Sequence, residues 1–286
     1  MFNEINNIID VKSGDSLSGW FIGISDSNSD GTFFIHHFLS HCLKSSLPVC
    51  FIALNQSFGH YNSVSQKFGT NLIPLKDSKK LEFIEGLKIV GNLCLTNYDK
   101  GDNSVNLNNS QTVVNSLLQS ISTSYEELKA TNSVGPTIII DNISCLISLG
   151  LTVKDVIGFC HYLHELTHRS ESGPGKGCLI IYSNNGKYDG DDQLKMLWNW
   201  ICHNSSVNIE VTGLLSGYCK DVHGEVNIIA SLSLLVFKKY ILFYLIMFCR
   251  CFLYLYGICN MLDIDKVSQF RIKRIKDLFY LCFQSN

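Results

Sequence analysis

The first 230 residues alternate between short apolar runs and longer stretches with a helical period. Short runs of apolar residues between polar turns predict strands, and these signals lie at Trp20–Ser25, Leu47–Leu54, Leu81–Glu85, Thr137–Asp141, Cys178–Tyr182, Val207–Thr212, Gly217–Lys220 and Glu225–Ile229. Apolar residues that recur every three or four positions predict helices, and these lie at Thr32–Lys44, His60–Phe68, Gln111–Ala130, Thr152–Arg169 and Asp192–Cys202.

The order of these elements predicts the sheet. Strands separated by helices form parallel βαβ units. The turn at Asp221–Gly224 would join the last two strands as an antiparallel hairpin. The polar segment Asp99–Ser110 is predicted to be a loop. We therefore predict an α/β fold of the RecA-like (P-loop ATPase) type with a mostly parallel sheet.

The first strand, turn and helix have the layout of a phosphate-binding loop but lack its residues. In the pattern G-x-x-x-x-G-K-[ST], backbone N–H groups close on phosphates, the Lys reaches them and the hydroxyl holds Mg²⁺. Here Asp26 takes the first Gly position, Gly31 the second, Thr32 the Lys position and Phe33 the Ser/Thr position. The sequence therefore predicts a degenerate Walker A turn.

Two carboxylates in this turn, Asp26 and Asp30, would face a bound triphosphate. Two like charges about 4 Å apart repel by about 4 kcal/mol at an effective dielectric constant of 20. We therefore expect no cofactor and no ATP hydrolysis, and we keep a nucleotide-binding regulator of the ATPase type as an alternative.

A second segment resembles Walker B. Thr137–Asp141 is an apolar strand that ends in Asp141, where P-loop enzymes hold Mg²⁺. Asn142 follows, where many such ATPases carry a catalytic Glu. An apolar run before an Asp is also typical of an ordinary strand end with a capping Asp, so we expect no live metal ligand here.

The strongest match to a catalytic motif is HExxH at residues 164–168. On a helix, His164 and His168 would share a face and could bind zinc, with Glu165 as general base. A zinc metallopeptidase is therefore the rival function. The sequence after His168 lacks the Gly-x-x-His continuation that supplies a third ligand in one class of these enzymes, so we interpret the motif as a polar helix face. His36, His37 and His41 are similarly predicted to be partly exposed helix residues.

Charge and cysteine content limit the partners and the compartment. Residues 230–286 hold 8 Lys/Arg and 3 Asp/Glu, so residues 1–229 carry a net charge of −7 within a total of −2. An acidic body is a poor nucleic-acid binder on its own. The 12 cysteines are scattered without a C-x-x-C pair, and no signal-peptide pattern opens the chain. We therefore expect reduced cysteines in an intracellular protein.

Several longer segments carry a family resemblance. They are MFNEINNII (1–9), DGTFFIHHFL (30–39), VCFIALNQSFGHYNSVSQKFG (49–69), LEFIEGLK (81–88), IIIDNISCLISLG (138–150) and GLLSGYCKDVHGEVNI (213–228). Together they resemble subunit 6 of the Elongator complex over about residues 1–229. The resemblance implies a RecA-like domain without Walker chemistry, and a non-catalytic subunit. It also implies a hetero-hexameric ring with subunits 4 and 5, docked on the catalytic core of Elongator, that supports tRNA binding and wobble-uridine modification. It places the protein in the cytoplasm and leaves the nucleus open as a second compartment.

Residues 230–286 diverge from that family. They hold 12 of the 32 aromatic residues, one Gly and no Pro, which suggests a translated intron or an alternative exon. The competing interpretation is a membrane anchor at Tyr240–Cys259. Arg250 lies at its centre and costs about 2.5–3.5 kcal/mol on the insertion scale, so we expect no membrane association.

In RecA-like rings, the loops after the fourth and fifth core strands point toward the channel, which here predicts Asn142–Leu151 and Ser183–Asn204. The second loop carries Lys187 and Lys195, which we predict as candidate tRNA contacts. Trp198 and Trp200 could stack on RNA, but a buried helix face fits them better.

Overall fold

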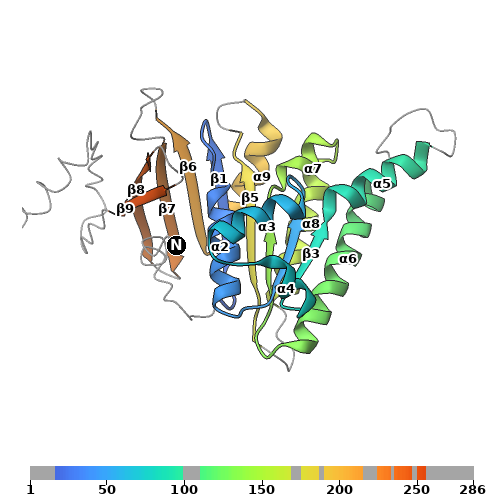
Figure 1. Ribbon diagram of the computed structural model, residues 1–286. Helices are drawn as coiled ribbons and strands as arrows, with labels where there is room; N and C mark the ends of the chain where they lie inside the picture. The colour runs from blue at the N-terminus through green and yellow to red at the C-terminus, as the bar shows by residue number, and fades with distance from the viewer. Residues whose placement is uncertain are drawn as a thin grey trace, which may run out of the picture.

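The computed structural model describes residues 17–98, 110–168, 175–186, 190–214, 224–232, 235–246 and 250–255. The strands in these ranges form one sheet in the order β3-β2-β4-β5-β1-β6-β7-β8-β9 (Figure 1). Their bounds are β1 Phe21–Ser27, β2 Val49–Ala53, β3 Leu81–Glu85, β4 Thr137–Ile140, β5 Cys178–Asn184, β6 Val207–Gly213, β7 Gly224–Leu232, β8 Leu235–Ile246 and β9 Arg250–Leu255.

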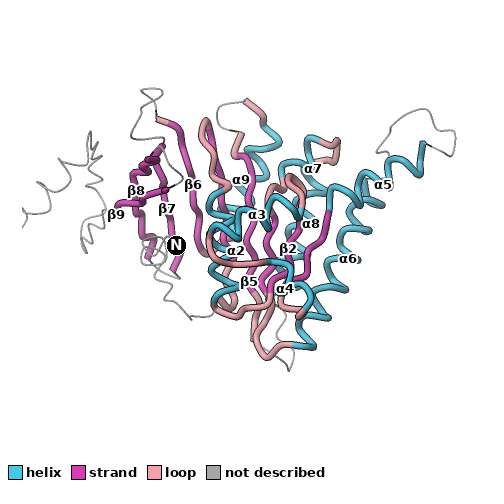
Figure 2. The backbone as a smooth tube through the Cα atoms, viewed as in Figure 1, coloured by secondary structure: helices cyan, strands magenta, loops and turns pink. Residues whose placement is uncertain are grey.

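Helices cover both faces of this sheet (Figure 2). The helices are α2 Phe33–Lys44, α3 Phe58–Lys67, α4 Leu72–Asp77, α5 Gly86–Tyr98, α6 Ser110–Thr131, α7 Ser144–Ser148, α8 Val153–His168 and α9 Asp192–Asn204. One apolar cluster joins the sheet to α2, α3 and α4, and a second joins its other face to α5 through α9. The architecture is therefore a three-layer α/β/α domain.

The direction of the strands confirms the predicted mostly parallel sheet. Every pairing among β3, β2, β4, β5, β1 and β6 is parallel. The β6–β7 pair is antiparallel, with Val211 opposite Val226, so an antiparallel strand is added at the edge of the parallel part of the sheet, as predicted. The strand predicted at Gly217–Lys220 and most of its turn lie outside the described residues, as does most of the predicted loop at Asp99–Ser110.

The sequence pattern missed α4, α5 and α7. α4 and α7 contain only 6 and 5 residues, which is too short for a helical period to show. α5 begins at Gly86 and contains Gly91, and glycine is a poor helix former.

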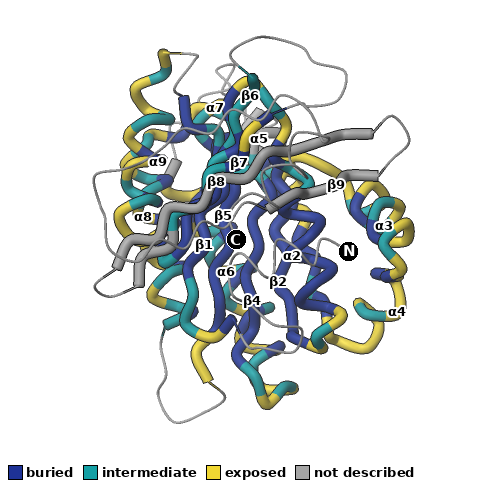
Figure 3. The backbone as a smooth tube through the Cα atoms, turned by 90° about the vertical axis from the view of Figure 1, so that its left-hand side faces the viewer, coloured by how far each residue is buried: buried dark blue, intermediate teal, exposed yellow. Residues whose placement is uncertain are grey.

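The central strands are buried on both faces, as Figure 3 shows. In β4, Ile139 contacts the α2–α4 layer while Ile138 and Ile140 contact the α5–α9 layer. Such strands read as continuous apolar runs because each face of a parallel sheet meets helices. Cys42, Cys50, Cys145, Cys160, Cys178 and Cys202 are free thiols.

The predicted boundary between residues 229 and 230 falls inside β7, which runs from Gly224 to Leu232. β7 pairs with β8 and β8 with β9, both antiparallel. Among the described residues, no helix is both long enough and apolar enough to span a membrane. Residues 256–286 lie outside the described ranges, and the division into two domains stays a prediction.

The histidines of α2 are buried, so the prediction of partly exposed side chains is wrong. His36, His37 and His41 are 8%, 1% and 7% exposed. The His36 ring packs 5.2 Å from the ring of Tyr61 on α3, and His37 stacks on His41 at 6.2 Å. Burial lowers the pKa of His36 to about 4 and that of His37 to about 3, with the neighbouring His60 and His41 adding to these effects. Both side chains are therefore neutral near pH 7.

Acid should destabilise the fold through these histidines. A histidine in the unfolded chain has a pKa near 6.5. Below that pH the unfolded state binds a proton, whereas the folded state stays unprotonated until the pH reaches its own, lower pKa, so acid favours unfolding. The contribution of His36 to the free energy of unfolding falls by about 2 kcal/mol between pH 6.5 and pH 5. In urea unfolding at pH 7 and pH 5, His36→Gln should lose less stability than wild type by about that amount. The exposed-site control His203→Gln should match wild type; equal pH dependence in all three proteins would contradict the assignment.

Candidate functional site

The carboxyl ends of β1, β2, β4 and β5 meet at one edge of the sheet, where parallel α/β proteins bind ligands. Asp26 lies near the end of β1, Gly31 lies in the turn that follows, and β4 ends directly before Asp141. The predicted Walker A and Walker B positions therefore do lie at the same edge. Their hydrogen bonds show what each position does.

Asp26 directs its carboxylate into the turn that a phosphate would occupy in a P-loop. Its Oδ2 accepts a hydrogen bond from the Gly31 N–H at 3.2 Å and another from the Tyr182 hydroxyl. Asp30 Oδ1 accepts from the Thr32 N–H at 2.9 Å and from its hydroxyl at 2.6 Å. Carboxylates of the chain itself therefore occupy donors that would otherwise be available to an anion.

The turn is also tightly packed. A Cβ atom at Gly31 would lie 3.2 Å from side-chain atoms of both Tyr182 and Val211, and 3.3 Å from the Asp26 side chain. Phe33, at the position of the Mg²⁺-binding hydroxyl, packs its ring 4.3 Å from that of Phe34. Burial raises the pKa of Asp26, and the hydrogen bonds from Tyr182 and Gly31 oppose that effect. Nothing in this geometry favours a bound triphosphate.

Asp141 holds the loop that follows β2. Its Oδ1 accepts from the Leu54 N–H at 2.6 Å, and its Oδ2 from the N–H groups of Asn55 at 3.0 Å and Gln56 at 3.3 Å. The Tyr61 hydroxyl donates to the same Oδ2 at 2.8 Å. Asp141 is 1% exposed. Burial raises its pKa, and these hydrogen bonds oppose the effect. The carboxylate therefore acts as a structural acceptor.

Asn142 lies two residues before a short helix. Its Oδ1 accepts from the N–H of Ser144, the first residue of α7, at 3.0 Å. The Ser144 hydroxyl lies 3.0 Å from the Ser183 hydroxyl and accepts from the Asn184 N–H at 2.8 Å. The start of α7 is thereby linked to the end of β5.

Two functional partners were not predicted from the sequence: Tyr61, which donates to Asp141, and Tyr182, which donates to Asp26. Tyr182 ends a predicted strand and Tyr61 lies in a predicted helix. No pattern in the sequence pairs either tyrosine with its carboxylate, because 80 residues separate Tyr61 from Asp141 and 156 separate Tyr182 from Asp26.

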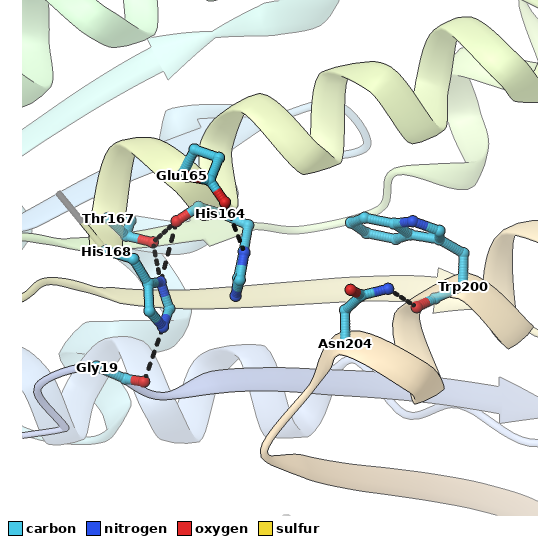
Figure 4. A network of polar contacts seen from close by, with 7 residues as sticks. All are labelled: Gly19, His164, Glu165, Thr167, His168, Trp200 and Asn204. Carbon is cyan, nitrogen blue, oxygen red and sulfur yellow. Dashed lines mark hydrogen bonds and ion pairs between the residues drawn. The ribbon is translucent and has the colours of Figure 1, made fainter.

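The HExxH residues lie on α8, where two backbone carbonyl groups lie beside the His168 ring (Figure 4). Its Nε2 is 3.1 Å from the Gly19 oxygen and its Nδ1 is 3.0 Å from the His164 oxygen. Glu165 Oε1 is 3.8 Å from His164 Nδ1. Within the described ranges, no three His, Cys, Asp or Glu side chains are grouped as a metal site requires. The arrangement links α8 to the start of β1.

The two lysines predicted to contact tRNA, Lys187 and Lys195, are not both described by the structure. Lys187 is outside the described residues. Lys195 is on α9, with its Nζ 3.1 Å from Asp192 Oδ1. Trp198 is 2% exposed and donates from Nε1 to Glu210 Oε1 at 3.0 Å. Trp200 is partly buried, 6.2 Å from the Phe21 ring. Trp198 therefore belongs to the buried helix face that we favoured for both tryptophans.

Replacing Asp141 by Asn should destabilise the protein. The amide nitrogen cannot accept hydrogen bonds, so buried donors near Leu54 or Tyr61 would lose their acceptor, at a cost of about 1–3 kcal/mol. Urea unfolding measures this loss. Asp77→Asn, a change of the same chemistry at an exposed position, should stay within about 0.5 kcal/mol of wild type. Equal unfolding midpoints for Asp141→Asn and wild type would show that the four hydrogen bonds contribute nothing.

Known proteins with similar folds were compared by structure. A protein from Pyrococcus horikoshii that was solved in complex with an unknown peptide has a TM-score of 0.60 at 12% identity, covering 89% of this chain and 98% of that one. A KaiC-like protein from the same organism has a TM-score of 0.52 at 14% identity, covering 79% and 86%. These likenesses confirm the predicted RecA-like fold and, at such low identity, nothing more.

Comparison by sequence identifies the family. The family model described as "Elongation complex protein 6" matches residues 2–239, which extends ten residues beyond the resemblance seen in the sequence. Elongator complex protein 6 from Xenopus laevis is 34% identical over 231 residues, covering 80% of this chain and 86% of that protein. The human protein of the same name is 30% identical over 237 residues, with the same coverage. The chain belongs to the Elongator complex protein 6 family.

Proposed function

We propose that this chain is a non-catalytic subunit of Elongator that joins subunits 4 and 5 in a hetero-hexameric ring of two copies each. The ring would dock on the catalytic core of the complex and support tRNA binding during wobble-uridine modification. The work would take place in the cytoplasm, with the nucleus as a second compartment. Lys187 and Lys195 stay our candidate contacts to tRNA within that ring.

One observation carries the non-catalytic part of this proposal. At the edge where a RecA-like ATPase holds phosphate and Mg²⁺, Asp26 and Asp141 bind the chain's own backbone N–H groups and tyrosines. A catalytic site needs groups that are free to meet the reacting atoms. Here Asp26 and Asp141 instead stabilise the folded chain. Membership of the Elongator complex protein 6 family supports the proposal that the chain is a subunit of that complex.

The rival functions lack such support. A nucleotide-binding regulator needs open anion donors in the turn after β1, where Asp26 and Asp30 already accept from Gly31 and Thr32. A zinc peptidase needs ring nitrogens directed at a metal, whereas both nitrogens of His168 contact backbone oxygens.

Co-expression tests the proposed ring. The tagged full chain should co-purify with Elongator subunits 4 and 5, and native mass spectrometry should give two copies of each subunit. Omitting one partner at a time serves as the control, because a closed ring of three subunit types should not form from two. If the chain elutes alone in the presence of both partners, the proposed assembly is wrong.

The isolated chain should not hydrolyse ATP, and Thr32→Lys should not create activity. The new lysine would still lie beside the two carboxylates of the turn, and Asn142 provides no catalytic base. Release of inorganic phosphate with Mg-ATP, together with titration of labelled ATP, measures both properties. Turnover that follows the protein through purification would refute a non-catalytic role, and micromolar ATP binding by wild type would favour the nucleotide-binding regulator.

A further inference from the structure

Lysines gather on one stretch of an otherwise acidic chain. Residues 44–80 contain Lys44, Lys67, Lys76, Lys79 and Lys80 but one acidic residue, Asp77. Residues 1–229 as a whole carry a net charge of −7. All five lysines are exposed. A positive surface on a negative body marks a place where the chain can attract an anionic partner.

This surface, which we call the α3–α4 surface, covers the outer side of one helical layer. α3 and α4 are largely exposed in Figure 3. Asn62 Oδ1 on α3 accepts from the Leu72 N–H at the start of α4 at 3.0 Å, so the two helices are fixed to each other. Lys76 Nζ lies 5.3 Å from the centre of the Phe58 ring. The lysines of this surface are therefore carried by two helices whose relative position is fixed.

The last two of these lysines lie at the opposite edge of the sheet from Asp141. The Lys80 oxygen accepts from the N–H of Val49, the first residue of β2, at 2.9 Å. β2 and β3 start at this edge and run toward the edge that holds the degenerate Walker positions. The α3–α4 surface is thus distinct from the site described above and from Lys195 on α9.

The backbone at Lys79 has a defined conformation at the end of α4. Lys79 has φ 53°, in the left-handed region that favours glycine. α3 and α4 end with the same pair of hydrogen bonds, and α3 has Gly69, with φ 75°, at the equivalent position. α2 ends in the same way, with Ser46 at φ 57°, so all three helices end in this conformation. The hydrogen bonds hold Lys79 at an ordered surface position where glycine would also fit the backbone.

Charge pairing does not account for these lysines. In the described part of the chain, the ion pairs of lysine are Lys88 with Glu85 and Lys195 with Asp192. Lys44 donates to the Phe68 oxygen at 2.6 Å and so stabilises the end of α3. Among the residues that the structure describes, Lys67, Lys79 and Lys80 show neither contact, and we take their charges to be available to an outside partner.

We propose that the α3–α4 surface binds the phosphate backbone of a structured RNA. Lysine is depleted at protein–protein interfaces, whereas neutralisation of phosphates by lysine supplies most of the non-specific affinity for nucleic acid. Lysines on flexible stems read backbone and shape, so binding should be insensitive to sequence and sensitive to salt. That the RNA is tRNA, and that it is met within a ring, rests on the proposed function.

The test compares two triple variants of the full chain, each assembled with subunits 4 and 5. Lys76→Gln, Lys79→Gly and Lys80→Gln remove three charges from the α3–α4 surface, and glycine suits the backbone at position 79. Lys88→Gln, Lys129→Gln and Lys154→Gln remove the same charge from helices of the other layer. Fluorescence anisotropy with a transcribed tRNA between 50 and 200 mM KCl gives affinity and salt dependence, and co-purification reports ring assembly separately.

The α3–α4 variant should assemble normally, bind tRNA about 10-fold or more weakly at 50 mM KCl, and lower the salt slope by about three units. The control variant should change the slope by less than about one unit. Equal losses in both variants would overturn the inference, because net charge alone would explain them. Unchanged tRNA affinity of the assembled α3–α4 variant would also overturn it, and loss of co-purification by that variant alone would assign the surface to an acidic protein partner instead. Either result leaves wild-type assembly, and so the proposed function, intact.

Discussion

The buried carboxylate of Asp141 determines the structure of the sheet edge on which any function of this fold depends. Its two oxygens accept three backbone N–H groups from the loop after β2 and the hydroxyl of Tyr61. A buried carboxylate is costly unless its oxygens are hydrogen-bonded, so the loop and the carboxylate require each other. Since β4 lies between β2 and β5, this contact orders the middle of the edge.

The turn after β1 follows the same principle. Asp26 accepts from Gly31 and Tyr182, so β1, β5 and the start of α2 are joined through one carboxylate. In a P-loop enzyme the ligand supplies the negative charge at this place. Here the chain supplies it, and the edge is complete without a ligand. This arrangement supports the non-catalytic role that we propose.

Much of the fold could be predicted because its strands are buried on both faces and read as apolar runs, as Thr137–Ile140 shows. The degenerate positions Asp26, Thr32 and Asp141 could be placed by spacing within the strand–turn–helix pattern. Their partners could not, since tertiary packing alone brings Tyr182 to Asp26. The burial of His36 could not be predicted for the same reason. The apolar residues of α2 already account for its contact with the sheet, and Tyr61 on α3 covers another side of the helix.

The most direct test of this account is hydrogen exchange at the backbone amides of Gly31, Leu54 and Asn55, measured by mass spectrometry with and without Mg-ATP. Each amide donates to a carboxylate of the chain. The account predicts slow exchange without nucleotide and no change when Mg-ATP is added. Rapid exchange that becomes slow on addition of Mg-ATP would show an open nucleotide site and contradict it.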